Sequence, residues 1–124
     1  MRYDPNRDLD VEAWLDLDEE ERISAVMDYH RRARVKLPNL KVHAVLHTIV
    51  ENQAALGADY PVAGKLEQLM QEGLDRHEAV HAIGSVLARY MFEVQQGRIT
   101  EEFNEAYLRD LAALSVESWH AQFG

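Results

Sequence analysis

The sequence contains no cysteine, which excludes disulfide bonds and leaves histidine, carboxylates, backbone carbonyls and water to hold any metal. Only three prolines and six glycines interrupt the 124 residues, so we expect helical segments joined by short links. Long hydrophobic runs are also missing, since none approaches the ~20 residues that a helix needs to cross a bilayer. Residues 1–5 lack the apolar stretch of a secretory signal. We therefore expect a soluble, cytoplasmic protein without a membrane partner.

Basic residues are outnumbered: 13 lysines and arginines stand against 22 aspartates and glutamates, which gives a net charge of −9. A field of this sign repels phosphate backbones, so we expect no nucleic-acid partner. Apolar residues make up 47% of the chain, an ordinary fraction for a globular protein. This length and composition predict a single domain over residues 1–124, in which residues 1–8 form an irregular tail.

No segment alternates apolar and polar residues with a period of two, so we predict an all-α fold, a four- to five-helix bundle. A short helix is expected over 9–17. Bundles of this size often pair through an exposed apolar stripe, which makes a homodimer a reasonable expectation. The longer helices are expected from a cap at Asp16 or Asp18 to about Val35, from Pro38 and Asn39 to near Gly57, over 61–73, from Asp75 to Gly97, and from Thr100 to a point between Ser115 and Trp119.

Two of these helices show an apolar face on a helical wheel, and we expect both faces in the core. The face of the helix over 38–57 comprises Val42, Val45, Leu46, Ile49 and Leu56. The face of the helix over 75–97 comprises Val80, Ile83, Leu87, Tyr90, Met91 and Val94.

Histidines at a spacing of four residues lie at the edge of each apolar face. His77-Glu78-Ala79-Val80-His81 is an H-E-x-x-H string, and His43 and His47 repeat the spacing 34 residues upstream. Both pairs fall near the beginning of their helix, so each helix presents two imidazoles on one side. If the helix over 61–73 runs back between the other two, those two are parallel, and the four histidines meet at one end of the bundle.

Four converging imidazoles are typical ligands of a transition metal, and neutral histidine is the form that binds. We therefore predict a site for a divalent transition metal (Zn, Ni or Fe) held by His43, His47, His77 and His81. Glu51, one turn after His47, is a further candidate ligand. His30 and His120 are expected at the surface or at the core boundary.

Two alternatives stay open. In a metal-dependent hydrolase, His77 and His81 would bind zinc, Glu78 would act as the general base on a zinc-bound water, and Glu105 could supply a third ligand. In a metal-free interaction module, the histidines would instead be structural groups that form hydrogen bonds at the core boundary. The sequence does not decide whether the protein is an enzyme.

The two histidine segments resemble a family of small bacterial proteins catalogued as a domain of unknown function. Members of that family carry an H-x3-H…E-x-Q segment followed by an H-E-x2-H segment. The similarity covers about residues 10–95. The matching positions are His43, His47, Glu51, Gln53, His77, Glu78 and His81. The resemblance implies that the histidine pattern defines the family, and it implies no particular activity.

Overall fold

The computed structural model describes residues 1–34, 37–99 and 105–123, and all regular structure in these ranges is helical. The predicted all-α class is confirmed, but the described ranges contain more helices than the four or five expected. None of these helices is long and apolar enough to cross a membrane. The elements are α1 (Val11–Leu15), α2 (Glu19–Arg32), α3 (Leu40–Ala54), the short 3-10 helix η1 (Gly57–Asp59), α4 (Val62–Gln71), α5 (Arg76–Gln95), α6 (Glu105–Ala113) and α7 (Val116–Phe123).

Side chains that cap helix beginnings set most of these boundaries. Asp18 and Asp75 each accept a hydrogen bond from the backbone N–H three residues later, and the glutamate at that position bonds back, so α2 and α5 both begin with a capping box. Asn39 caps α3 through the N–H of Val42. The predicted boundaries at Val35 and Thr100 lie outside the described residues.

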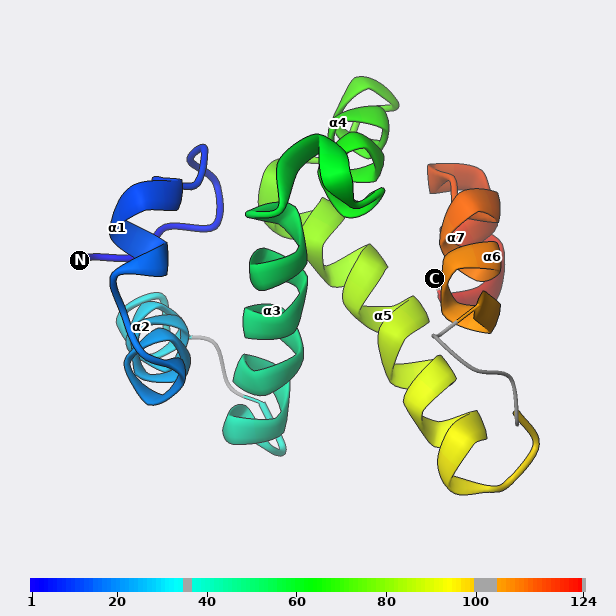
Figure 1. Cartoon of the computed structure of the whole chain (residues 1–124), viewed down its shortest axis with the longest axis horizontal. Helices are drawn as coiled ribbons and strands as arrows, with labels where there is room; N and C mark the ends of the chain where they lie inside the picture. The colour runs from blue at the N-terminus through cyan, green and yellow to red at the C-terminus, as the bar shows by residue number, and fades with distance from the viewer. Residues whose placement is uncertain (35–36, 100–104, 124) are drawn as a thin grey trace.

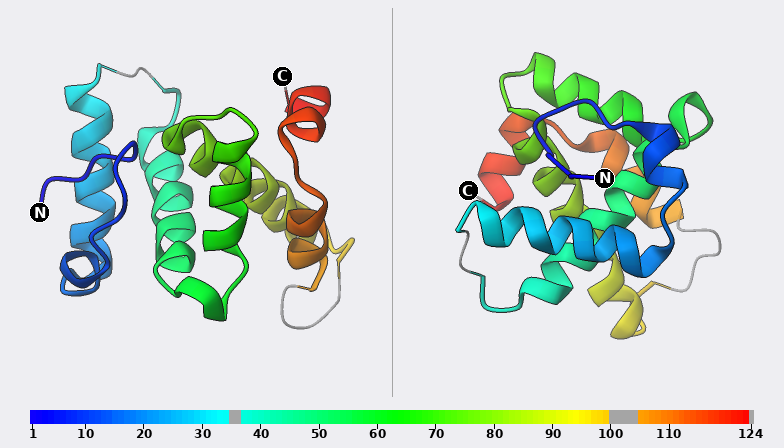
Figure 2. Two further views of the ribbon diagram at one scale, coloured as in Figure 1. Left: turned by 90° about the horizontal axis from the view of Figure 1, so that it is seen from above. Right: turned by 90° about the vertical axis from the view of Figure 1, so that its left-hand side faces the viewer.

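Helix α3 lies in the middle of the molecule, with α2 on one side and α5 on the other (Figure 1). The view from above shows the same order, with α6 and α7 on the far side of α5 from α3 (Figure 2, left). Helix α4 lies across the end of α3 and the beginning of α5, and it contacts both. The ten residues of α4 therefore connect the two long helices around one end of the molecule.

The expectation that α3 and α5 are parallel was wrong. Glu51 contacts Arg76, and His47 lies against His77, so the end of α3 meets the beginning of α5. Further along, His43 contacts His81, so residue numbers fall along α3 as they rise along α5. The two helices are antiparallel because α4 lies across their shared end instead of running back between them. The histidine pairs still meet, since both pairs lie in the stretch where the helices face each other.

Two apolar clusters flank the middle of α3. The larger one, formed by α3 to α6 and their links, contains Val50, Val62, Leu66, Leu69, Leu74, Ala79, Val80, Ala82, Ile83, Val86, Leu87, Tyr107, Leu111 and Leu114. The smaller one contains Tyr3, Trp14, Ile23, Val26 and Ala44, and so joins the N-terminal segment, α1 and α2 to α3. Polar side chains of α3 are buried between the two clusters, including His47, Thr48 and Glu51.

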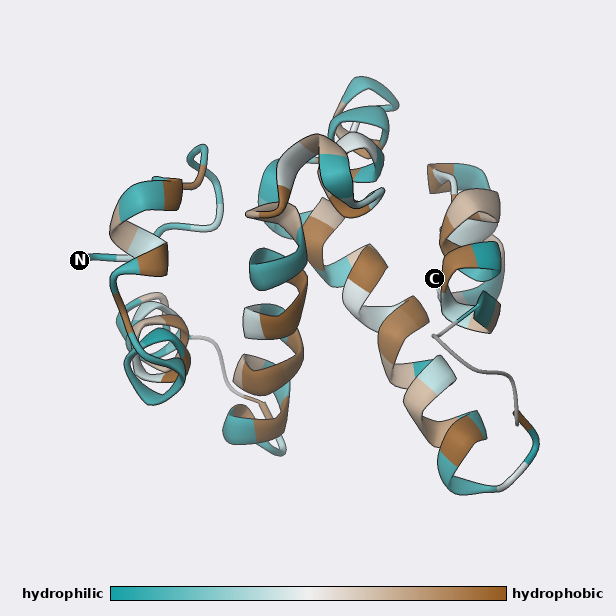
Figure 3. Ribbon diagram, in the orientation of Figure 1, coloured by the Kyte–Doolittle hydropathy of each residue, from teal (hydrophilic) through white to brown (hydrophobic). Residues whose placement is uncertain are grey.

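The predicted apolar faces are only partly buried. Val80, Ile83 and Leu87 lie in the core as expected, but the C-terminal turns of α5 carry exposed hydrophobic residues, visible as brown bands in Figure 3. The helical wheel predicted that the most apolar face of α3 is buried. In the structure, the buried face of α3 carries histidine and glutamate. Four residues assigned to the core are 43–54% exposed: Val42, Leu56, Met91 and Val94.

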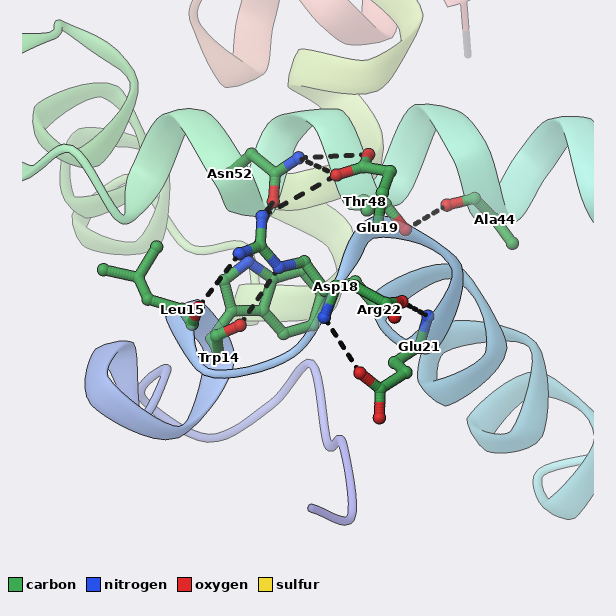
Figure 4. Close-up of polar contacts among 9 residues, drawn as sticks. All are labelled: Trp14, Leu15, Asp18, Glu19, Glu21, Arg22, Ala44, Thr48 and Asn52. Atoms are coloured by element: carbon green, nitrogen blue, oxygen red, sulfur yellow. Dashed lines mark hydrogen bonds and ion pairs between the residues drawn. The ribbon is translucent and has the colours of Figure 1, made fainter.

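A polar network attaches α1 and α2 to α3 (Figure 4). The indole N–H of Trp14 donates to the side-chain oxygen of Asn52 at 2.9 Å, and the Arg22 guanidinium donates to the same oxygen at 3.1 Å. Arg22 also donates to the carbonyl of Trp14 at 3.0 Å, so one guanidinium satisfies groups of both α1 and α3. This attachment fixes the face of α2 that points toward α3.

Candidate metal centre

Five histidines meet where α2, α3 and α5 come together. His30 comes from α2, His43 and His47 from α3, and His77 and His81 from α5. Ring centroids are 4.7 Å apart for His30 and His43, 4.7 Å for His43 and His81, and 4.2 Å for His77 and His81. His47 lies 5.4 Å from His77 and 5.3 Å from His30. The structure therefore brings the two predicted pairs together and adds a fifth imidazole.

His30 corrects an expectation, because it is fully buried and not a surface or boundary residue. Its Nδ1 lies 2.8 Å from the carbonyl oxygen of Val26, one turn earlier in α2, so Nδ1 carries the hydrogen and donates it. The lone pair is therefore on Nε2, which lies 3.2 Å from His43 Nε2. This tautomer offers Nε2 to the centre of the cluster.

A second hydrogen-bond chain sets the tautomer of His47. The Tyr3 hydroxyl donates its hydrogen to the carboxylate of Glu51, so its oxygen is left to accept the hydrogen of His47 Nε2 at 2.7 Å. The lone pair of His47 is then on Nδ1, a buried atom with no hydrogen-bond partner among the described residues. Partners that orient a ligating histidine in this way are usual at metal sites.

Arg76 neutralises the charge of Glu51. Its guanidinium forms two hydrogen bonds with the carboxylate, at 2.8 and 2.7 Å, and donates to the carbonyl of Pro5 at 3.0 Å. Glu51 has no exposed surface and Arg76 is 8% exposed, so this is a buried ion pair. Burial lowers the pKa of Arg76, but the hydrogen bonds and charge of Glu51 outweigh this and raise that pKa. Both carboxylate oxygens of Glu51 are therefore engaged by residues outside the histidine cluster.

The nitrogen atoms of the cluster lie close enough together to form a group that could hold one metal ion. One nitrogen from each of His30, His47, His77 and His81 forms a group in which all atoms lie within 4.8 Å of one another. His43 Nε2 lies 3.0 Å from His81 Nε2, a little less than the about 3.3–3.4 Å between neighbouring ligands that tetrahedral Zn–N bonds of about 2.0–2.1 Å imply. His43 is thus placed to act as a fifth ligand or to hydrogen-bond a ligand.

Two of the four histidines in this group carry a buried nitrogen atom that lacks a hydrogen-bond partner among the described residues: His47 Nδ1 and His77 Nε2. A buried polar atom without a partner costs about 1–3 kcal/mol, and native structures contain few of them. A lone pair on a neutral imidazole nitrogen is a group that can bind a metal ion.

Burial and mutual repulsion lower the pKa of four of the histidines: His43, His47, His77 and His81. Desolvation first, and then the neighbouring imidazoles, lower the pKa of His43 to about 4 and that of His81 to about 3. The same causes hold the pKa of His47 well below its usual value, and burial followed by the charge of His30 lowers that of His77. At neutral pH these side chains therefore carry the lone pairs that metal binding requires.

The carboxylates of the hydrolase alternative lie elsewhere. Glu78 is exposed, and its carboxylate accepts the backbone N–H of Asp75 at 3.1 Å as part of the capping box of α5. Glu105 is exposed at the first residue of α6. His120, the sixth histidine, is exposed on α7, as expected at the surface.

The sequence analysis missed three residues that complete the site: Tyr3, His30 and Arg76. For His30 a signal was present, since it follows Val26 by one helical turn on the inner face of α2. Tyr3 lies in a segment without regular structure, and its 1% exposure depends on contacts with distant helices. No local pattern marks a residue of that kind.

Comparisons with protein-family models, with curated proteins and with solved structures find no match for this chain. The resemblance of the two histidine segments to a family of unknown function therefore stays a prediction.

Proposed function

We propose that this protein binds a divalent transition metal at the cluster formed by His30, His47, His77 and His81, with His43 beside them. The observation that supports the proposal is that one ring nitrogen from each of these four histidines lies within 4.8 Å of the others, while two of the four side chains also carry a buried nitrogen without a partner among the described residues. Imidazole ligands suit Zn, Ni and Fe, the ions expected from the sequence. Glu51 supports the site from outside, because it holds Tyr3 and through it His47.

The test is elemental analysis of protein purified without a polyhistidine tag, followed by a zinc titration against a competing chelator. We expect close to one equivalent of metal and an increase in melting temperature with added zinc. Replacing His47 by Gln should lower zinc affinity by at least a hundredfold, because the site loses a ligand. His120→Ala is the matched control, since His120 is an exposed histidine outside the cluster.

Metal content below about a tenth of an equivalent, together with no thermal stabilisation by Zn²⁺, Ni²⁺ or Fe²⁺, would contradict the proposal. That result would favour the metal-free interaction module. Equal zinc affinity for the His47→Gln and His120→Ala variants would also contradict it, because metal would then bind elsewhere. Circular dichroism of both variants distinguishes a lost ligand from a lost fold.

The hydrolase alternative has less support from the geometry. A general base must reach a metal-bound water, whereas the Glu78 carboxylate is exposed and bonded to the beginning of its own helix. We expect Glu78→Gln to weaken the cap and to leave zinc binding unchanged. A hydrolytic activity that this substitution abolishes while zinc stays bound would restore the alternative.

A further inference from the structure

A cleft adjoins the histidine cluster along α5. Its volume is about 330 Å³, near the lower end of the about 300–1,000 Å³ of small-molecule sites. His43, His47 and His81 line its polar part. The remaining lining residues are small or apolar: Leu46, Val80, Gly84, Ser85, Ala88 and Trp119.

Gly84 is the most informative residue of the lining. It lies inside α5, where glycine destabilises a helix by about 1 kcal/mol relative to alanine. A Cβ atom built on Gly84 would meet no atom within 4 Å, so close packing does not require glycine at this position. A side chain there would project beside His81, one helical turn away, and would fill part of the cleft. The missing side chain leaves space next to the metal ligands.

Two proposed metal ligands, His47 and His81, belong to both the histidine cluster and the lining of the cleft. His47 is 2% exposed, and its Nδ1 has no hydrogen-bond partner among the described residues. An ion held by these two residues would therefore lie beside the cleft.

Charge decides which ligand fits. Histidine binds a metal as a neutral group, and Arg76 pairs with Glu51, so no carboxylate among the proposed ligands compensates the 2+ charge of the ion. The lining of the cleft contains no lysine, arginine, aspartate or glutamate. The positive charge that would attract an anion into the cleft would therefore come from the metal.

We propose that this cleft binds a small organic acid, with its carboxylate as a fifth ligand of the metal in place of His43 and its apolar body between Leu46, Ala88 and Trp119. The inference rests on the proposed metal site and adds the class of ligand. The ion would bind the carboxylate through its charge. The apolar lining of the cleft would select the hydrocarbon part of the acid.

The experiment measures binding of acetate, butyrate, hexanoate and octanoate to zinc-loaded and to metal-free protein by calorimetry. In the zinc-loaded protein, affinity should rise roughly fourfold for each added methylene until the cleft is full. Metal-free protein should bind none of the four acids. Equal affinity along the series, or the same series without zinc, would overturn the inference.

Gly84→Leu fills the cleft without changing a ligand. We expect it to weaken hexanoate binding at least tenfold and acetate binding much less, with zinc affinity measured alongside. Gly64→Leu is the matched control, because Gly64 also lies inside a helix with open space at its Cβ but does not line the cleft. Equal hexanoate affinity for both variants would overturn the inference. The zinc titration is read separately, so a protein that takes up no zinc refutes the metal site itself and is recognised as such.

Discussion

Replacing Arg76 by Met tests the buried ion pair of Arg76 and Glu51, which lies behind the histidine cluster. The substitution preserves much of the side-chain volume but removes the guanidinium that makes two hydrogen bonds to Glu51, at 2.7 and 2.8 Å. Glu51 has no exposed surface, so its carboxylate would remain buried without a counter-charge. Loss of one partner of such a pair costs about 3–5 kcal/mol. The carbonyl of Pro5 also loses its donor, which favours the upper part of that range.

The double variant Glu51→Leu, Arg76→Met removes both charges and should recover most of this stability, because apolar residues of similar size replace buried pairs with little loss. Metal binding should not recover with it. Without Glu51, the Tyr3 hydroxyl turns its hydrogen toward His47 Nε2, which moves the histidine's own hydrogen onto Nδ1. The atom that faces the cluster then carries a proton, and we expect a 10- to 100-fold loss of zinc affinity.

The assay is urea unfolding followed by circular dichroism at pH 7 in the presence of a chelator, with zinc affinity measured separately. The reasoning is refuted if Arg76→Met lowers the free energy of unfolding by less than about 1 kcal/mol. It is also refuted if the double variant is no more stable than Arg76→Met alone. Stability and zinc affinity that recover together would show that Glu51 does not set the tautomer of His47.

Two further predictions concern the same cluster. Tyr3→Phe should weaken zinc binding 10- to 100-fold in a chelator competition, since His47 Nε2 loses its acceptor, whereas Tyr107→Phe, which removes a buried hydroxyl bonded to Gln53, should not. Metal-free protein should lose stability as pH falls from about 6.5 toward 4. The fold lowers the pKa of His43 to about 4 and that of His81 to about 3. In this pH range the unfolded chain therefore binds protons at these histidines that the folded chain does not bind. Urea midpoints measured across this range should fall less steeply for His81→Gln, and equal slopes would count against the buried, neutral histidines.

Local sequence signals predicted the helices well and their directions poorly. Asp18, Asn39 and Asp75 were recognisable as caps because capping depends on residues three positions apart. Whether α3 and α5 run parallel depends instead on where α4 packs. The sequence of α4 is equally compatible with a helix that lies across the end of the bundle and with one that lies along the side of the bundle. The predicted meeting of the histidine pairs survived because α5 faces the half of α3 that carries them.

The composition of the site was harder to predict than its existence. A wheel identifies the inside of a helix by its hydrophobic residues, and in α3 this placed Val42 and Leu56 inward, although both are more than half exposed. The buried face is polar because α2 and the N-terminal segment cover it. His30 and Tyr3 enter the site through these long-range contacts, and no spacing within their own segments encodes such contacts.

The N-terminal segment joins the cluster through contacts that span most of the chain. The Pro5 carbonyl accepts from Arg76, and the Asn6 side chain accepts the backbone N–H of His77, each across 71 positions. Closing so large a loop is slow, because its entropy cost is offset only after the distant contacts have formed. During synthesis, Pro5 and Asn6 must therefore wait until α5 has emerged before they reach their partners. The proposed metal site is thus expected to reach full affinity among the last events of folding, and a chain ending before α5, which lacks His77 and His81, should release zinc readily.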